Sequence, residues 1–258
     1  MRDTSQRREK IIKMLREQGS VQVNALSQLF RVSTQTIRQD LGFLARIGMA
    51  ARAYGGAVLR ERQTSAPEAA LETKRQRFAA EKSAIGQMAA ALVGAGETVV
   101  LDSGTTTLQV AAHLPAELEL TVLTNDLAIA NEIATHEKVS LLVLGGALRR
   151  KNMSLYGSQA ENAMRDLSVD KLFLGVDGFD LTRGVTTHFE PEAVLNRMMC
   201  EAAAEIIVVM DSSKFGKICL HRIVEPANID KLITDERIPR DVLAVLTELG
   251  VEVIRVPL

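Results

Sequence analysis

The stretch 19–56 constrains the fold of this chain more than any other part of the sequence. Within it, Ile37, Leu41 and Leu44 recur at intervals of four and three residues, so a helix would carry all three on one buried face. Ser33 stands just before this pattern, where its hydroxyl can accept a hydrogen bond from a free backbone N–H of the first turn. The pattern therefore predicts a short amphipathic helix that begins close to Ser33.

Two further patterns complete this N-terminal region. A preceding short helix is predicted from apolar residues at helical spacing, namely Ala25, Leu26, Leu29 and Phe30. After the second helix, two apolar runs within 49–59 flank Gly55-Gly56, which predicts a hairpin with a glycine turn. The segment 21–23 is expected to form a short strand that pairs with this hairpin. Helix, turn, helix and hairpin together predict a winged helix-turn-helix, an α+β unit.

The outer face of the second helix is polar and suits double-stranded DNA. In the major groove Gln pairs with adenine and Arg with guanine, and hydroxyls at a helix start can meet a phosphate or a base edge. The candidate DNA-binding residues are Ser33, Thr34, Gln35, Thr36, Arg38, Gln39, Arg46, Arg52 and Tyr54. The alternative is a helical hairpin with a solvated polar face. Such a face would carry mixed charges, but the acids between 22 and 62 are Asp40 and Glu61 alone.

The charge of the chain is divided unequally along its length. Residues 1–60 hold 11 Lys+Arg against 4 Asp+Glu, whereas residues 61–258 hold 20 against 28. A basic N-terminal part on an acidic body is the balance of a nucleic-acid reader attached to a second domain. Aromatic residues make up only 3% of the chain and Trp is absent, which disfavours a single-strand binder that stacks bases.

Several other classes of protein are disfavoured by what the sequence contains. Cys200 and Cys219 stand apart in apolar runs, so we expect reduced core thiols. The four histidines are isolated, and we expect neither a metal site nor a cofactor. No apolar run reaches membrane length, so we expect no membrane partner and a cytoplasmic protein that works at the nucleoid.

We expect a winged helix-turn-helix domain at 1–60, with the helix-turn-helix at about 20–46, a linker at 61–70 and a second domain at 71–258. The second domain opens with a long predicted helix from Leu71 to about Leu92. Apolar runs then alternate with helical stretches, which predicts an α/β fold with a mainly parallel sheet covered on both faces. The strands are expected at 98–101, 120–123, 139–144, 172–176, 206–210, 232–234 and 251–256.

Polar motifs follow five of these predicted strands, at the edge where parallel sheets bind their ligands. Residues 102–107 carry hydroxyls and a glycine at a helix start, which makes an anion site, and Lys214 adds a positive charge. The candidate ligand-binding residues are Asp102, Ser103, Gly104, Thr105, Thr106, Thr107, Asn125, Gly145, Gly146, Asp177 and Lys214. Capping or turn chemistry explains any one motif. Five together favour a pocket for a phosphorylated polyol or sugar. The basic cluster 149–151 is either a solvated loop or a second anion contact.

Two sets of motifs resemble one known family. Residues 32–44 read Val-Ser-x-x-Thr-Ile-Arg-x-Asp-Leu-x-x-Leu and are followed by Gly55-Gly56-Ala57, which resembles the DNA-binding domain of DeoR-family bacterial transcription regulators. Tyr54 stands where most of the family has His. The segments 102–107, 124–125, 145–146, 156–157, 174–177 and 211–214 resemble the sensor domain of the same family. Within the family, the likeness is greatest to repressors of N-acetylgalactosamine and galactosamine utilisation.

The resemblance implies both a fold and a function. The sensor domain of this family is related to ribose-5-phosphate isomerase and glucosamine-6-phosphate deaminase, and it binds a phosphorylated sugar without catalysis. The resemblance therefore implies a repressor of an amino-sugar catabolic operon, which a sugar phosphate releases from operator DNA. One recognition helix makes few contacts, so we expect a homo-oligomer, a dimer or a tetramer, on repeated half-sites.

Two alternatives remain open at the level of sequence. The first is a sugar-phosphate isomerase or deaminase with an attached DNA-binding domain, whose acid–base groups would come from Asp177, Asp180, His188, Glu190 and Glu192. The second is a transcriptional activator of the same architecture. We expect no enzyme activity.

Overall fold

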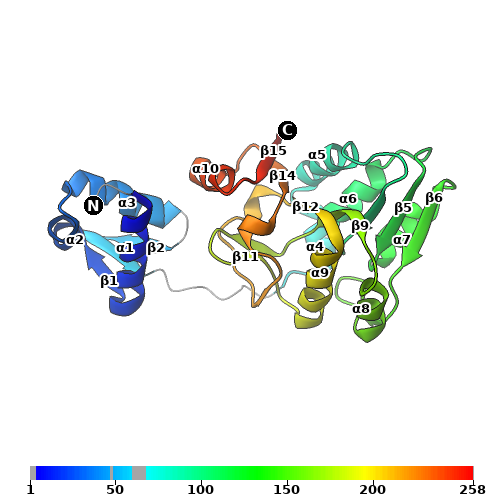
Figure 1. Ribbon diagram of the computed structural model, residues 1–258, viewed down its shortest axis with the longest axis horizontal. Helices are drawn as coiled ribbons and strands as arrows, with labels where there is room; N and C mark the ends of the chain where they lie inside the picture. The colour runs from blue at the N-terminus through cyan, green and yellow to red at the C-terminus, as the bar shows by residue number, and fades with distance from the viewer. Residues whose placement is uncertain (1–3, 47–48, 60–67, 258) are drawn as a thin grey trace. The chain divides into compact units, whose positions relative to one another are not determined.

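The computed structural model describes residues 4–46, 49–59 and 68–257 (Figure 1). The chain divides into two compact units, 1–63 and 64–258, each described below by itself. The predicted linker at 61–70 lies outside the described residues except for its last three positions.

The first unit is a three-helix bundle with a three-stranded antiparallel sheet, in the order β1-β3-β2. Its elements are α1 (Thr4–Gln18), β1 (Ser20–Gln22), α2 (Val23–Phe30), α3 (Thr34–Arg46), β2 (Ala50–Ala53) and β3 (Gly56–Leu59). Val21 pairs with Ala57, so the predicted short strand does join the hairpin, and the predicted winged helix-turn-helix is confirmed.

The core of this unit is built by one face of each helix. Ile37, Leu41 and Leu44 are buried as predicted. On α2 the prediction was too wide, because Leu29 is 59% exposed and Ala25 is also exposed. This helix has only eight residues, and Val23, Leu26 and Phe30 are the ones it buries.

The turn between α2 and α3 is fixed by side chains that bond to the backbone. Arg31 takes a left-handed conformation with φ 54°, and its N–H bonds to the carbonyl of Ser27, which ends α2. The Ser27 hydroxyl in turn donates to the carbonyl of Val32 at 2.6 Å. Ser33 then accepts from the N–H of Thr36 at 3.1 Å, so the predicted N-cap of α3 is confirmed.

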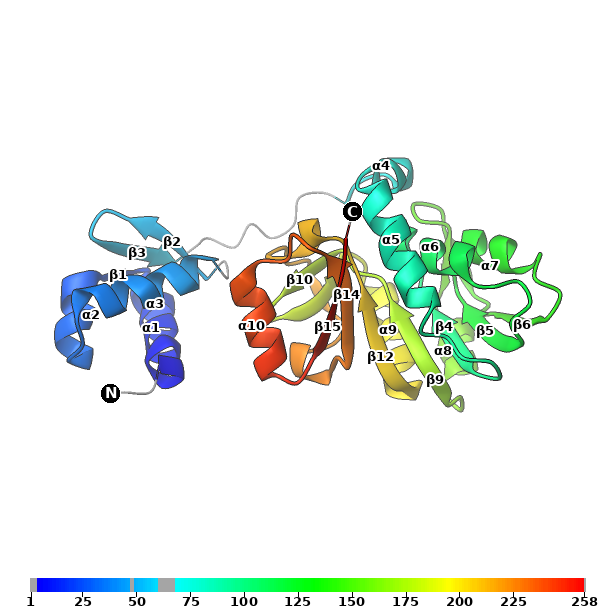
Figure 2. The same cartoon turned by 90° about the horizontal axis from the view of Figure 1, so that it is seen from above.

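Within the described residues of the second unit, seven strands form one parallel sheet in the order β15-β14-β12-β9-β4-β5-β6 (Figure 2). They are β4 (Thr98–Leu101), β5 (Leu120–Thr124), β6 (Val139–Val143), β9 (Val169–Leu174), β12 (Ala203–Val209), β14 (Lys231–Asp235) and β15 (Glu252–Val256). The α/β fold with a mainly parallel sheet is thus confirmed, with strand boundaries that differ from the predicted ones by up to three residues.

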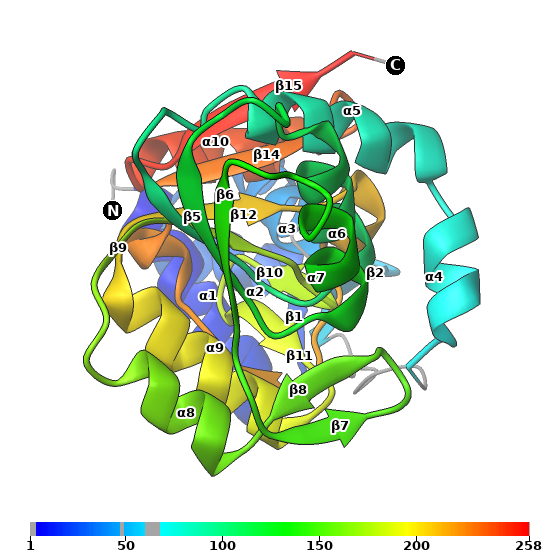
Figure 3. The same cartoon turned by 90° about the vertical axis from the view of Figure 1, so that its right-hand side faces the viewer.

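Helices cover both faces of this sheet, which is why its central strands are apolar along their whole length (Figure 3). One face packs against α5 (Ala79–Ala90), α6 (Thr105–His113) and α7 (Leu127–Ile133). The other packs against α8 (Ser158–Met164), α9 (Glu190–Ala202) and α10 (Arg240–Glu248). None of the helices in the described ranges is long and apolar enough to span a membrane.

The long helix predicted from Leu71 to about Leu92 is wrong. The chain forms α4 (Leu71–Gln76) and α5, separated by an extended Arg77 and by Phe78 in the left-handed conformation with φ 55°. Only α5 packs on the sheet, whereas α4 has no buried residue. Packing therefore divides a stretch whose composition suits one continuous helix.

Short elements beside the sheet were not predicted. A hairpin joins β7 (Ala147–Arg149) to β8 (Ser154–Tyr156). A small antiparallel sheet joins β10 (Gly178–Asp180), β11 (Gly184–Thr187) and β13 (His221–Arg222). Strands of two to four residues are too short to show a hydrophobic period.

The order of the strands positions a site. From β4, the chain adds β5 and β6 on one side, while β9 and the later strands lie on the other. The carboxyl ends of β4 and β9 are therefore neighbours at the point where the direction of winding reverses. In open parallel sheets this switch point is where ligands bind.

Candidate functional site

The first candidate site is the polar face of α3, opposite the buried side chains of this helix. Gln35, Arg38 and Gln39 are exposed, and Thr34 and Thr36 at the helix start are partly exposed. The exposed residues occupy the positions that would face a DNA groove in a helix-turn-helix. The side chains of Arg46 and Arg52 lie outside the part of the chain that the structure describes.

Asp40, the acid on α3, is neutralised by the first helix. Its carboxylate is 2% exposed and accepts from Arg7 Nε at 2.6 Å and from Arg8 Nε at 2.9 Å. The Arg8 guanidinium also lies 3.8 Å above the ring of Phe43. This triad leaves the outer face of α3 without an exposed carboxylate among its described residues. No spacing in the sequence indicates it, because the partners are more than thirty positions apart.

The hairpin of β2 and β3 is the predicted wing, and its turn requires both glycines of the pair Gly55-Gly56. Gly55 has φ +74°, a conformation that favours glycine. A Cβ on Gly56 would lie 2.0 Å from the carbonyl oxygen of Val21, so only glycine fits where β3 crosses β1. Tyr54, at the tip, is fully exposed.

The second candidate site is a pocket at the carboxyl ends of β4 and β9. Its lining residues are Leu71, Lys74, Ser103, Gly104, Thr105, Thr106, Asn152, Gly175, Val176, Asp177, Thr187, Glu192 and Lys214. The structure thus brings together six of the residues singled out in the sequence, those at 103–106, 177 and 214. They come from the ends of three strands, β4, β9 and β12, which are adjacent in the sheet.

Five other candidates lie outside this lining. Asp102 is buried directly behind it, and Thr107 is buried in α6, where its hydroxyl bonds to the carbonyl of Gly104 at 3.0 Å. Asn125 donates to the carbonyl of Leu155 at 3.1 Å and so ties β5 to the β7–β8 hairpin.

The glycine pair after β6 also lies outside the lining. A Cβ on Gly146 would lie 2.3 Å from the carbonyl oxygen of Tyr156, and its φ is +121°. This glycine allows the close approach of the two hairpin strands. Gly145 beside it has only the side chain of Gln159 within contact range of a Cβ.

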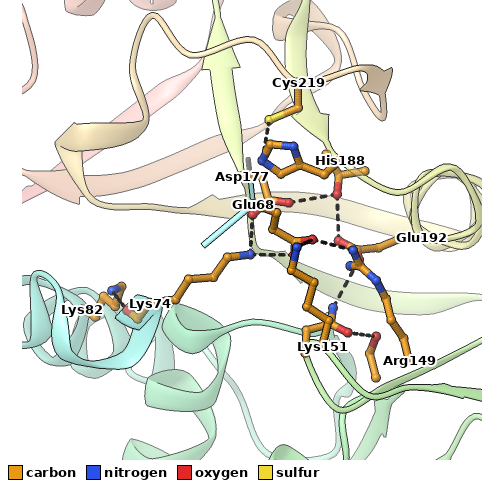
Figure 4. A network of polar contacts seen from close by, with 12 residues as sticks. Glu68, Lys74, Lys82, Arg149, Lys151, Asp177, His188, Glu192 and Cys219 are labelled. Carbon is orange, nitrogen blue, oxygen red and sulfur yellow. Dashed lines mark hydrogen bonds and ion pairs between the residues drawn. The ribbon is translucent and has the colours of Figure 1, made fainter. Parts of the chain in front are cut away.

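Ion pairs and hydrogen bonds connect four of the lining residues, Lys74, Asp177, Thr187 and Glu192, with Arg149 (Figure 4). Lys74 Nζ lies 2.8 Å from Asp177 Oδ1, and Arg149 Nη1 lies 2.7 Å from Glu192 Oε2. The Thr187 hydroxyl bridges the two acids, at 3.1 Å from Asp177 Oδ2 and 2.9 Å from Glu192 Oε1. Within the cluster 149–151, Arg149 is half-buried and paired with Glu192, a lining residue, whereas Arg150 is exposed.

The two pocket acids have pKa values shifted in opposite directions. Burial raises the pKa of Asp177, but the charge and hydrogen bond of Lys74 outweigh it and lower the pKa to about 2. Burial, and then the charge of Asp177, raise the pKa of Glu192 to about 7. Burial likewise raises the pKa of Asp102 well above its ordinary value, with the charge of Glu192 as the next cause. One acid of the pocket is thus firmly ionised while two retain a proton more readily.

Other lining residues carry hydrogen-bond donors for which no acceptor is found in the described parts of the chain. The Ser103 hydroxyl is buried and has no hydrogen-bond partner among the described residues. Thr105 and Thr106 begin α6, where backbone N–H groups point out of the helix. Within the described ranges, no carboxylate lies within ion-pair distance of Lys214 Nζ, and burial lowers the pKa of this ammonium group. These groups can hold an anion, and the acids can accept from hydroxyl or ammonium groups of the same ligand.

We also searched the described residues for metal-binding and thiol chemistry. No group of three or more potential metal ligands occurs among the described residues. Cys200 and Cys219 are free thiols, and burial raises the pKa of Cys219 to about 11. Two lining residues, Lys74 and Asn152, belong to none of the sequence motifs.

A surface helix-turn-helix with a wing, joined to a ligand-sized pocket at a sheet switch point, defines the class of one-component transcription regulators. The chain belongs to the DeoR family of these regulators. Residues 7–63 match the model of the DeoR-like helix-turn-helix domain, and residues 77–236 match that of the DeoR C terminal sensor domain.

Curated relatives resemble the chain over almost its whole length. The "Putative aga operon transcriptional repressor" of Escherichia coli O157:H7 is 50% identical over 98% of this chain and 94% of its own. The transcriptional repressor GlcR of Bacillus subtilis is 32% identical over 95% of this chain and 93% of its own. A solved ribose 5-phosphate isomerase from Methanocaldococcus jannaschii is 17% identical, with a TM-score of 0.40 over 55% of each chain. A likeness at that level carries no argument about activity.

Proposed function

We propose that this DeoR-family member represses an amino-sugar catabolic operon and that a phosphorylated sugar in the pocket of the second unit releases it from the operator. One observation carries the proposal. Six residues singled out for ligand binding converge on one pocket at the switch point of the sheet, in a chain whose other unit is a winged helix-turn-helix.

The effector's phosphate would lie against the start of α6, between the Ser103 hydroxyl and Lys214. This placement gives Lys214 the negative partner that the described residues do not provide, and it gives Ser103 an acceptor. The carboxylates of Asp177 and Glu192 would accept from hydroxyl or amino groups of the sugar. The relative named for the aga operon directs the search to amino-sugar phosphates, with galactosamine 6-phosphate first.

The operator would be contacted by α3 in the major groove and by the wing. The proposed contacts are Ser33, Thr34, Gln35, Thr36, Arg38, Gln39, Arg46, Arg52 and Tyr54. Since one recognition helix buries little surface on DNA, the protein would bind as a dimer or tetramer. It would act in the cytoplasm, at the nucleoid.

The rival function is a sugar-phosphate isomerase or deaminase. The opposite pKa shifts of Asp177 and Glu192 are what acid–base catalysis uses. Both acids are, however, engaged by cations of the chain itself, Lys74 and Arg149. We therefore propose binding without turnover, and turnover of ribose 5-phosphate or galactosamine 6-phosphate would contradict this.

Deletion of the gene distinguishes a repressor from an activator. Operon expression should rise on deletion if the protein is a repressor.

The experiment is operator release titrated with a panel of sugar phosphates, after thermal-shift screening. A ligand that binds only the folded state raises the melting temperature. Lys214→Ala should leave operator affinity intact and weaken the effector about tenfold or more, since it removes a charged contact in a pocket. Lys217→Ala is the matched control, because this exposed lysine lies on the same loop outside the lining. A Lys214→Ala release curve that overlays the wild-type curve removes Lys214 from the site.

A further inference from the structure

We propose that the carboxylate of Glu68 is a built-in competitor of the effector: it occupies an anion subsite formed by Lys74, Arg149 and Lys151, and an acidic group of the effector expels it. This inference rests on the proposed function and names a second anion-binding position in the same pocket. It also assigns a role to Glu68 and Lys74, which the sequence motifs do not include.

The geometry at Glu68 is that of a bound anion. Oε1 lies 3.0 Å from Lys74 Nζ, while Oε2 lies 2.6 Å from Arg149 Nη2 and 3.2 Å from Lys151 Nζ (Figure 4). The Glu68 side chain is only 5% exposed. Three cations from two separate segments thus converge on one carboxylate. Planar guanidinium and ammonium donors of this kind hold phosphate as readily as carboxylate.

The subsite adjoins the pocket. Lys74 lines the pocket, and so does Asn152, from the turn that carries Lys151. Arg149 links the subsite to Glu192 in the lining. A ligand that fills the pocket therefore meets Lys74 directly, and Arg149 and Lys151 lie behind it on the same carboxylate.

Glu68 is charged when it occupies the subsite. Burial raises its pKa, but the charge and hydrogen bond of Lys74, together with the charge of Arg149, lower it below the ordinary value. Lys74 and Arg149 also pair with Asp177 and Glu192, so Glu68 is one of several acids on these cations. A phosphate brings three acceptor oxygens and a larger negative charge at pH 7 than the carboxylate of Glu68 does. Glu68, however, is tethered, and its high local concentration compensates for its smaller charge.

Expulsion of Glu68 would loosen the segment that carries it. The helix α4 buries no residue, and its described polar anchors are the pairs of Lys74 and the bond from Lys82 Nζ to the carbonyl of Lys74 at 2.5 Å. In the sequence, Glu68 follows directly after 60–67, the stretch that joins the two units. Effector binding is thereby coupled to the point where the sensor unit leads to the DNA-binding unit.

A different role for Glu68 predicts the opposite effect of its removal on effector affinity. If Glu68 only oriented Lys74 and Arg149 toward the ligand, its loss would weaken effector binding. If Glu68 competes, the wild-type protein binds through the fraction of molecules in which the subsite is vacant, and its apparent affinity is reduced by that fraction. Neutralising Glu68 then strengthens binding.

The test compares Glu68→Gln with the wild type by calorimetric titration of the full chain with galactosamine 6-phosphate and, separately, with inorganic phosphate. The variant keeps the shape of the side chain and removes its charge. We expect the dissociation constants of both probes to fall at least roughly fivefold, the lower end of ordinary coupling between sites. Operator release should need correspondingly less sugar phosphate. Glu72→Gln is the matched control, because Glu72 is exposed on α4 and bonds to Gln76; its constants should equal those of the wild type.

The outcomes separate this inference from the proposed function. If the sugar phosphate binds Glu68→Gln as tightly as the wild type, or more weakly, Glu68 is not a competitor. The proposal that a sugar phosphate is the effector would still stand. Tighter binding of inorganic phosphate alone, with no sugar phosphate bound by either protein, supports the subsite and overturns the proposed effector. Binding of neither probe to either protein overturns both.

A second measurement does not depend on the variant. Hydrogen exchange of the segment 68–76 in the wild type should rise when galactosamine 6-phosphate is added, because the Glu68 contacts are lost. Increased protection of that segment would mean that it closes over the ligand, which contradicts displacement.

Discussion

The two units of this protein arrange their charges in opposite ways. On α3 the polar face is exposed and carries Arg38, while the one acid of that helix, Asp40, is turned inward and neutralised by α1. In the pocket, two of the cations face a carboxylate at close range, as Lys74 does with Asp177 and Arg149 with Glu192.

The difference follows from the ligands that the two surfaces are proposed to meet. DNA is a long polyanion, and exposed cations gain affinity for it by releasing counterions, with a strong dependence on salt. A small pocket must bury its charges, and an unpaired buried charge is costly, so carboxylates of the chain itself pair with Lys74 and Arg149. The first surface should respond to salt, and the second to pH and to competing anions.

The largest effect is expected from Asp40→Ala. This change removes the carboxylate shared by Arg7 and Arg8 in the core of the first unit, and breaking a buried ion pair costs about 3–5 kcal/mol of unfolding free energy. Glu17→Ala is the control, because Glu17 makes only an exposed pair with Lys13 at 3.9 Å, worth less than about 0.5 kcal/mol. Chemical denaturation, followed together with operator binding, measures both. Equal losses for the two variants would contradict the structural role of Asp40.

A smaller effect is expected from Arg38→Ala. If Arg38 pairs with a base, operator affinity should fall by about 1–3 kcal/mol while affinity for random DNA changes little. If it meets only phosphate, affinity for all sequences should weaken alike and the salt slope should decrease by about 1. Lys13→Ala removes the same charge from the exposed side of α1 and is the control. Unchanged binding to operator and to random DNA would show that α3 is not the recognition helix.

The two units also differ in how much of their structure could be predicted from the sequence. The first region is predictable because its information is local: the period of Ile37, Leu41 and Leu44 gives the buried face of α3, and Ser33 gives its start. The exposed polar residues are then those on the opposite face of the same helix. What was missed there, the triad at Asp40, joins side chains from two different helices.

In the second region, the loops were predictable and their partners were not. Ser103, Asp177 and Lys214 could be singled out because each follows an apolar strand, and parallel strands end at one edge. Lys74 lies 103 positions from Asp177, on a helix whose break at Phe78 no local pattern indicates. The pairing of Lys74 with Asp177 depends on how α4 packs beside the end of β9, and residue propensities carry no information about that packing.

The last effect, and the one most particular to the pocket, concerns Glu192 and pH. Its pKa is raised to about 7 in the folded protein, chiefly by burial and then by Asp177, from an ordinary 4.5. Between these values the folded state holds a proton that the unfolded state releases. Its contribution to stability is therefore complete below pH 4.5 and is lost as the pH rises through 7, at up to about 1.4 kcal/mol per pH unit.

Glu192→Gln imitates the protonated carboxyl and removes this dependence. Asp177 does not obscure the comparison, because its pKa of about 2 makes its contribution constant above pH 5. The variant should thus gain stability over the wild type steadily from pH 5 to pH 7.5, measured by chemical denaturation at several pH values. Glu190→Gln, at the exposed start of the same helix, should follow the wild type. A stability difference between Glu192→Gln and the wild type that is independent of pH would show that the pocket keeps Glu192 ionised, with Arg149 outweighing its burial.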